Sequence, residues 1–209
     1  NFLSLEKNVK GEVNFKPFYL FTDLNFNYIN QKKIFQSDSL FIDLLDSELL
    51  NNPNLNAAIN IKIDKIDKFE YLQDFISKIH LGDGRILIKN FYTEWNDSVL
   101  VKSNEIEFLN DLDGKKLVGE IIFNFEDIEK FFRYFQIKRN YRDVFKTIKL
   151  DFVYDLTLDK LSMNNLRIDN KSFKKIDNFL NEYNKSKSNS FNKVTIRNFI
   201  KEFFQVYSG

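Results

Sequence analysis

The sequence predicts a mainly β protein of the α+β class, in which a curved antiparallel meander sheet forms a groove or trough and a few short helices accompany it. Three observations support this fold. Stretches of alternating apolar and polar residues recur along the 209-residue chain, short turn sequences separate them, and helical periodicity is limited to a few short stretches. Because 43% of the residues are apolar, a chain of this length can form a sizeable core.

Five stretches alternate with the period of two that is typical of a half-buried strand. Residues 69–81 fit either a helix or a strand, and the short turn that follows them favours a strand. The predicted sheet therefore has at least six strands. The five clear stretches cover residues 18–28, 57–64, 85–89, 116–125 and 148–157.

Short turns join neighbouring strands of the predicted sheet. Gly82-Asp83-Gly84 separates two strands, Asp111-Leu112-Asp113-Gly114 precedes a third, and Leu158-Asp159-Lys160 is a weaker turn. Glycine supplies the positive φ that tight hairpins need. Strands joined by such short turns pair antiparallel in the order of the sequence, which is a meander.

Helical periodicity predicts short helices between and after the strands. Acidic residues at the start of 126–136 favour a helix N-terminus there, and Ser172 is a candidate N-cap for the helix that follows it. The predicted helices cover residues 126–136, 139–146, 173–183 and 194–207, with a further candidate within 38–50.

Two parts of the chain differ in character. Residues 1–170 are predicted to form the sheet module, with a helical insertion at about 126–146, and residues 171–209 to form Phe-rich amphipathic helices that cap it. The chain starts with Asn and shows no signal-peptide pattern, so we expect the C-terminal fragment of a longer protein.

The composition excludes several classes of protein. The chain has no Cys and a single His80, so disulfide scaffolds, Cys-based metal sites and His–His metal pairs are excluded. Lys and Arg total 31 against 30 Asp and Glu, and the net charge of +1 provides no general field for nucleic acid. We expect no nucleic-acid partner and no cofactor.

Candidate catalytic residues are few. His80 has Asp83 nearby, but no Ser or Cys nucleophile lies in a recognisable motif. Gly82-x-Gly84 lacks the third glycine and the following helix of a nucleotide loop. The sequence therefore predicts no enzyme and no catalytic residue; the enzymatic alternative is a hydrolase that uses His80 or pairs of carboxylates such as Asp43 and Asp46.

One stretch mimics a calcium-binding loop. Asp111, Asp113, Gly114 and Glu120 match four of its positions, but Leu109 stands where the first ligand belongs. Strands also flank this stretch, whereas such a loop lies between helices. We therefore expect no metal site.

The C-terminal part is locally basic. Residues 171–209 contain eight Lys and Arg and three acidic residues, a balance of +5. Together with the Phe stripes, this charge makes the terminal helices amphipathic and cationic. They either cap the sheet with their apolar faces or contact an anionic membrane surface or a partner.

The apolar strand faces are the main functional feature. A strongly curved sheet with an apolar inner face forms a groove suited to acyl chains, because each buried methylene stabilises binding by about 0.8 kcal/mol. The residues predicted to contact lipid are Phe18, Leu20, Leu24, Phe26, Ile59, Ile61, Ile63, Ile86, Ile88, Phe152 and Tyr154.

Several motifs resemble a known family. The hairpin 81–88 contains Asp83-Gly84-Arg85-Ile86-Leu87-Ile88, which is similar to the D-G-x-L-x-I turn-and-strand pattern of AsmA-like proteins, with Ile in place of Leu. The stretches 142–152 and 198–205 also resemble the ends of such proteins. The chain therefore resembles the AsmA-like C-terminal region of bacterial envelope proteins over most of its length.

The resemblance implies a non-enzymatic envelope module. AsmA-like proteins are anchored in the inner membrane by an N-terminal helix, project a β-groove into the periplasm, and take part in phospholipid transport to the outer membrane and in outer-membrane assembly. It thus implies a periplasmic location, an anchor outside this fragment and phospholipid acyl chains as partners. The alternative is a structural or protein-interaction β module of the envelope with a closed core.

Overall fold

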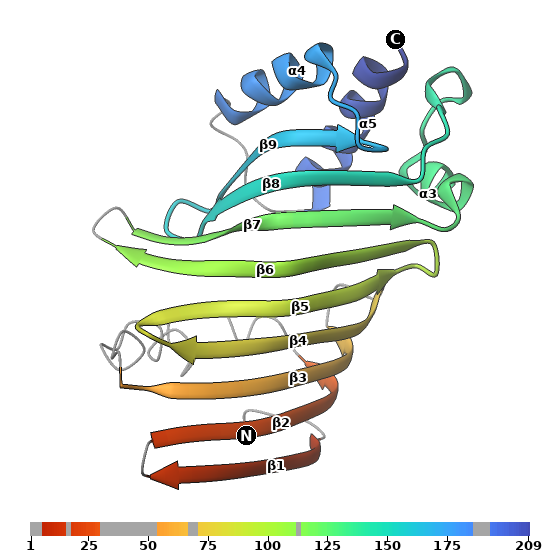
Figure 1. The fold of residues 1–209 in the computed structure, drawn as a ribbon. Coiled ribbons are helices and arrows are strands. Elements are labelled where there is room, and N and C mark those ends of the chain that lie inside the picture. Colours follow the sequence, from red (N-terminus) through yellow and green to blue (C-terminus); the bar gives the residue numbers. More distant parts are fainter. Residues whose placement is uncertain (1–5, 16–17, 30–53, 67–70, 112–113, 186–192) are drawn as a thin grey trace. The chain divides into compact units, whose positions relative to one another are not determined.

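The computed structural model describes residues 6–15, 18–29, 54–66, 71–111, 114–185 and 193–209. Its strands form a nine-stranded, mostly antiparallel open sheet in which they follow one another in the order of the sequence (Figure 1). The mainly β fold predicted from the sequence is therefore confirmed. The predicted helix within 38–50 lies outside the described residues.

The elements have the following bounds. The strands are β1 (Glu6–Phe15), β2 (Phe18–Ile29), β3 (Asn56–Ile66), β4 (Leu72–Gly82), β5 (Arg85–Trp95), β6 (Val99–Asp111), β7 (Gly114–Phe125), β8 (Thr147–Asp155) and β9 (Lys160–Ile168). The described helices are α3 (Ile128–Phe135), α4 (Lys174–Lys185), α5 (Lys193–Ser208) and the 3₁₀ turn η2 (Arg139–Tyr141).

One step departs from the antiparallel meander. β2 and β3 pair in parallel, with Leu24 opposite Ile61 and Phe26 opposite Ile63. A parallel pair needs a crossover connection of about a dozen residues or more. The chain between Ile29 and Asn56 is long enough for such a crossover connection. The turns predicted from the sequence are too short for one.

The turn between β4 and β5 has the predicted hairpin geometry. Gly82 pairs with Arg85, and the two residues between them both have positive φ, 54° at Asp83 and 71° at Gly84. Two consecutive positive φ values define a type I′ turn, whose twist matches that of the flanking strands. The ambiguous stretch 69–81 forms strand β4, as the turn indicated.

The prediction of a helix over residues 139–146 is wrong. Only the short η2 turn forms, and the chain then runs to β8. The Nε of Arg142 donates to the carbonyl of Ile137 at 2.9 Å. Phe145 is buried against the rings of Phe125 and Phe204 at 5.0 and 5.8 Å. Tertiary contacts of these side chains hold the segment out of a helix.

The chain divides into two compact units within β6. The first unit comprises residues 1–96 and 103–108, and the second comprises residues 97–102 and 109–209. These units do not coincide with the division at residue 170 that the sequence predicts.

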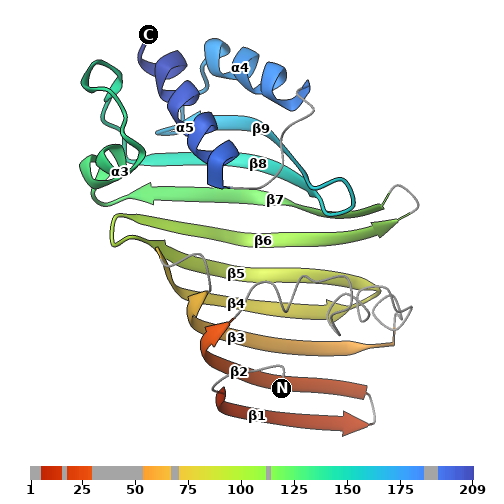
Figure 2. The same ribbon diagram turned by 180° about the vertical axis from the view of Figure 1, so that it is seen from behind.

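The second unit has an aromatic core beside its helices. Phe132 and Phe204 are 0% and 1% exposed, and their rings meet edge to face at 5.1 Å. Helix α5 crosses one face of β7–β9 (Figure 2). Ile148 and Leu150 are buried, whereas Lys149 between them pairs with Glu120 at 2.7 Å. The terminal helices therefore cover an apolar face in this unit, as one of the two predicted roles requires.

The outer edge of β9 is capped by a side chain of α4. The Met163 N–H donates to Oδ1 of Asn184 at 3.0 Å, and Nδ2 of Asn184 donates to the Met163 carbonyl at 2.8 Å. A strand edge left open exposes backbone groups that can pair with another strand. Asn184 satisfies both groups of Met163, so this edge is blocked at that residue.

Candidate functional site

The strand register of the first unit gathers most of the predicted lipid-contacting residues on one face. The same face continues from β2 through β3 and β4 into β5, because each strand contributes every second residue to it. We call the residues of this patch the apolar face of β2–β5. Its rows across the sheet are Leu20, Ala57, Leu81 and Ile86; Thr22, Ile59, Ile79 and Ile88; Leu24, Ile61 and Ser77; and Phe26, Ile63 and Phe75.

Burial varies across this face. Phe26 and Ile63 are 8% and 7% exposed and form a cluster with Ile29, against which Leu24 and Ile61 pack. At the same end, Phe75 meets the ring of Phe91 edge to face at 5.3 Å. Half-buried side chains include Leu24, Ile59, Ile61, Ile79 and Ile88 in the two middle rows and Leu20 in the first row, whereas Ser77 in a middle row is buried. The middle of the face therefore keeps part of its apolar surface in contact with solvent.

Three predicted residues do not appear in these rows. For Phe18 only the backbone position, opposite Phe15, is described. Phe152 and Tyr154 lie on β8 in the second unit, where they are half-buried opposite Met163 and Leu161. The alternation that marks Phe152 and Tyr154 as strand residues does not reveal which unit a strand joins.

Tyr154 has a specific polar contact. Its hydroxyl donates to Oδ1 of Asp159 at 2.7 Å, within the turn that follows β8. Burial, and then this hydrogen bond to a carboxylate, raise the pKa of Tyr154 well above its usual value of 10.0. Tyr154 is therefore held as a neutral phenol tied to its own turn.

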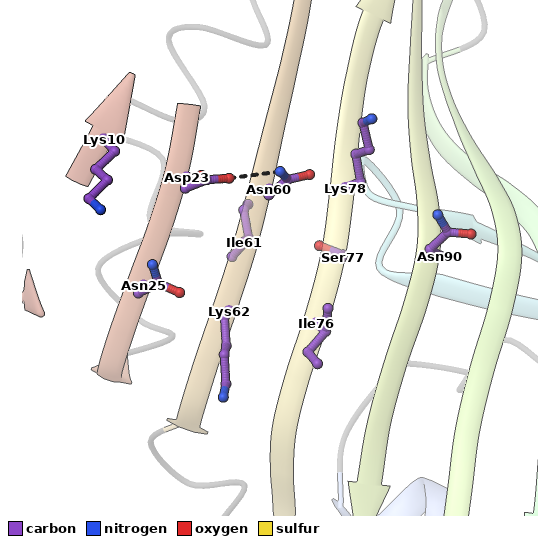
Figure 3. Close-up of a pocket in the computed structure, with 10 residues that line it drawn as sticks. All are labelled: Lys10, Asp23, Asn25, Asn60, Ile61, Lys62, Ile76, Ser77, Lys78 and Asn90. Atoms are coloured by element: carbon purple, nitrogen blue, oxygen red, sulfur yellow. Dashed lines mark hydrogen bonds between the residues drawn. The ribbon is translucent and has the colours of Figure 1, made fainter. Parts of the chain in front are cut away.

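A hollow of about 500 Å³ lies on the opposite, polar face of β1–β5 (Figure 3). Most of its polar residues come from the positions that alternate with the apolar face, whereas Ile61 and Ser77 belong to a row of that face. Within it, Nδ2 of Asn60 donates to Oδ1 of Asp23 at 2.7 Å. The residues lining it are Lys10, Asp23, Asn25, Asn60, Ile61, Lys62, Ile76, Ser77, Lys78 and Asn90.

The lining of this hollow is mixed. Three lysines and three asparagines contribute polar groups, which would lose hydration beside a hydrocarbon, but most of the exposed lining is apolar and includes Ile61 and Ile76. The sequence prediction places the groove on the apolar face, and this hollow is on the other one. In the sequence, the signal for this hollow is the set of polar residues that alternate with the apolar residues along each strand.

The candidate catalytic and metal residues do not converge. His80 lies on β4 between Ala58 and Leu87, and it hydrogen-bonds no carboxylate in the described part of the chain. A Cβ on Gly82 would lie 3.0 Å from Nε2 of His80, so this glycine leaves room for the imidazole. Within the described ranges, no group of three acidic or histidine residues is placed to hold a metal ion.

The calcium-loop mimic belongs to a hairpin. β6 ends at Asp111 and β7 begins at Gly114, whose φ is 114°. Glu120 lies within β7, where it pairs with Lys149. Asp113 lies outside the described residues.

Neither the described helices nor comparisons with known proteins point to a function. None of the described helices has the length and hydropathy that a bilayer-spanning segment needs. No protein-family model matches this chain significantly, and neither a curated protein nor a solved structure does so.

Proposed function

We propose that the first unit binds lipid acyl chains along the apolar face of β2–β5, without catalysis. The observation that carries this proposal is the register, which aligns apolar residues from four neighbouring strands into one patch with a half-buried middle. Extended apolar patches on a protein surface are typical of interaction sites. A lipid tail gains about 0.8 kcal/mol for each methylene that such a patch removes from water.

The cellular part of the proposal comes from the resemblance to AsmA-like proteins. In this account the chain is a periplasmic module, held at the inner membrane by a segment outside it, that contributes to phospholipid transport to the outer membrane or to outer-membrane assembly. The basic residues of α4 and α5 offer a contact for an anionic membrane surface.

The second candidate is a structural or protein-interaction β module with a closed core. The aromatic core of the second unit favours it, because Phe132 and Phe204 are almost fully buried there and pack against each other. This candidate predicts that the purified protein takes up no lipid.

A matched pair of variants distinguishes the two candidates. Ile61 and Lys62 are neighbours on β3, and their side chains lie on opposite faces of the strand. I61E places a charge on the half-buried part of the apolar face, and K62E places the same charge on the other face. We expect I61E to weaken the binding of a fluorescent fatty acid at least about tenfold, because the carboxylate must be desolvated beside the acyl chain.

K62E is the control and should bind the fatty acid as the unmodified protein does. If thermal unfolding shows that I61E is not folded, I61T provides a milder change and should weaken binding in the same direction. Equal binding by folded variants at positions 61 and 62 would contradict the proposed site.

A further inference from the structure

The polar hollow of β1–β5 gathers lysines from three strands. The register places Lys10, Asp23, Asn60 and Lys78 in one row across β1–β4. Lys62 lies two residues further along β3, on the same face as Asn60. All five residues line the hollow (Figure 3).

The three lysines surround Asn60. Neighbouring strands lie about 4.8 Å apart and two residues along a strand span about 6.7 Å, so each lysine Cα is within about 10 Å of that of Asn60. In Figure 3, Lys62 and Lys78 extend along their strands in opposite directions. Each ammonium group is carried on a flexible four-carbon stem, so all three can turn toward one small anion above Asn60.

The described carboxylates do not neutralise the positive charge of the hollow. None of its three lysines forms an ion pair within the described ranges, whereas Lys89, Lys130 and Lys149 do pair with acidic residues. The one carboxylate of the described lining, Asp23, accepts the hydrogen bond of Asn60 at 2.7 Å. Three lysines and one aspartate leave this lining with a net charge of +2.

Lys78 is placed unfavourably among these cations. It lies opposite Lys89 of β5, and like charges that face each other across a strand pair are destabilising. Lys89 has Glu105 at 3.6 Å, whereas half-buried Lys78 has no acidic partner in the described part of the chain. An anion bound in the hollow would offset this repulsion.

We propose that the hollow binds a phosphate monoester, held by the ammonium groups of Lys10, Lys62 and Lys78. Such a group carries a charge of about −1.5 to −2 at pH 7 and has oxygens that accept charge-assisted hydrogen bonds, so it matches the charge of the lining. Ile76, which is 42% exposed and lies opposite Lys62, offers apolar surface to the carbon part of the ligand.

Isothermal titration calorimetry of the full chain with glycerol phosphate tests the site. We expect the unmodified protein to bind this probe and K78Q, which removes one of three cations, to bind it at least about tenfold more weakly. K65Q is the control and should bind as the unmodified protein does, because Lys65 is exposed on β3 outside the described lining.

A change of the opposite sign separates this effect from misfolding. D23N removes the carboxylate that repels phosphate, while the new amide oxygen can still accept the hydrogen bond from Asn60. We therefore expect D23N to bind glycerol phosphate at least about threefold more tightly than the unmodified protein. Damage to the fold would weaken binding instead.

Vesicles distinguish a free phosphate ester from a lipid headgroup. Co-sedimentation compares phosphatidylcholine vesicles with and without phosphatidic acid, whose headgroup is a phosphate monoester. Binding of either probe supports the site if K78Q weakens it and K65Q does not. Binding to the vesicles alone would identify the lipid headgroup as the ligand.

Three results would overturn the proposal: a folded protein that binds neither probe, a K78Q variant that binds as tightly as the unmodified protein or no more weakly than K65Q, or a D23N variant whose affinity does not rise. None of them bears on the fatty-acid assay of I61E, because glycerol phosphate has no acyl chain and this site lies on the other face of the sheet.

Discussion

At the residue scale, Asn and Asp take the conformations that glycine usually provides. Among the described residues, Asp83, Asn96 and Asn165 belong to a set of ten residues other than glycine with positive φ, and all but Gln136 are Asn or Asp. Among the described glycines, only Gly84 and Gly114 have positive φ. Short polar side chains tolerate the left-handed region because they hydrogen-bond locally. This use of Asn and Asp explains how a chain with 6 glycines forms so many turns.

The charged side chain of Asp169 stabilises the fold at the start of β8. Its Oδ1 accepts hydrogen bonds from the backbone N–H of Lys146 at 3.0 Å and of Thr147 at 2.8 Å, at the start of β8. Desolvation alone would raise its pKa, but the hydrogen bonds from Thr147 and Lys146 outweigh this effect and lower the pKa below the ordinary 3.8.

This lowered pKa makes a pH-dependent contribution to stability. A carboxyl group with a lower pKa in the folded state stabilises the protein above its unfolded pKa, and the contribution disappears as the pH falls through the folded pKa. We expect the unfolding free energy of the unmodified protein to exceed that of D169N near neutral pH and this difference to shrink below about pH 3.8.

Denaturant titrations over a pH series measure this difference. D177N is the control, since Asp177 is exposed on α4 and its carboxylate accepts no hydrogen bond from the described residues. A difference between the unmodified protein and D169N that stays constant as the pH falls well below 3.8 would contradict the assignment.

At the element scale, the strands that the sequence predicts are those whose alternation is unbroken. β6 and β9 were not predicted, and each contains an irregularity. In β6 the buried positions change from odd, at Ser103, to even, at Ile106. In β9 Asn165 has a φ of 52° where the register with β8 shifts. A bulge moves later side chains to the opposite face, so a period-two pattern cannot follow such a strand.

The ambiguity of β4 has the same origin. Asp74 has a φ of 49°, and the register between β4 and β5 shifts on both sides of Ile76. Local sequence therefore indicates the strand only through the turn that follows it. β1 was also not predicted, because most of its described residues are exposed and it carries no continuous apolar face.

The cap on β9 provides a test at this scale. Because Asn184 satisfies the N–H and C=O of Met163 in a partly buried place, N184A leaves both groups without these partners. We expect N184A to lower the unfolding free energy by about 1–3 kcal/mol in denaturant titrations. N181A, an exposed change on the same helix, should alter it by less than about 0.5 kcal/mol. Equal effects of the two variants would show that the cap does not stabilise the edge.

At the scale of the whole molecule, the aromatic and aliphatic residues serve two purposes. In the second unit they form a core that helices cover, around Phe132 and Phe204. In the first unit they form the apolar face of β2–β5, whose middle is half-buried. Alternation in the sequence predicts both sets as strand or helix faces. It does not distinguish a covered face from an open one, because covering depends on contacts between residues far apart in the chain.

The candidate site was therefore predictable in part. The register aligns Leu20, Ile59 and Ile86 on one face, although Ile59 and Ile86 belong to different rows, and the sequence did not indicate which predicted residues would share a face. The polar hollow around Asp23 and Asn60 was not predicted, because only the packing of neighbouring strands brings these residues together.

Native mass spectrometry of the purified protein, ionised gently enough to keep bound lipid, tests the central claim most directly. The account predicts a population whose mass exceeds that of the polypeptide by one phospholipid or fatty acid, and this population should diminish in I61E and persist in K62E. A protein that carries no lipid, and that also acquires none when incubated with phospholipid vesicles, would contradict the account.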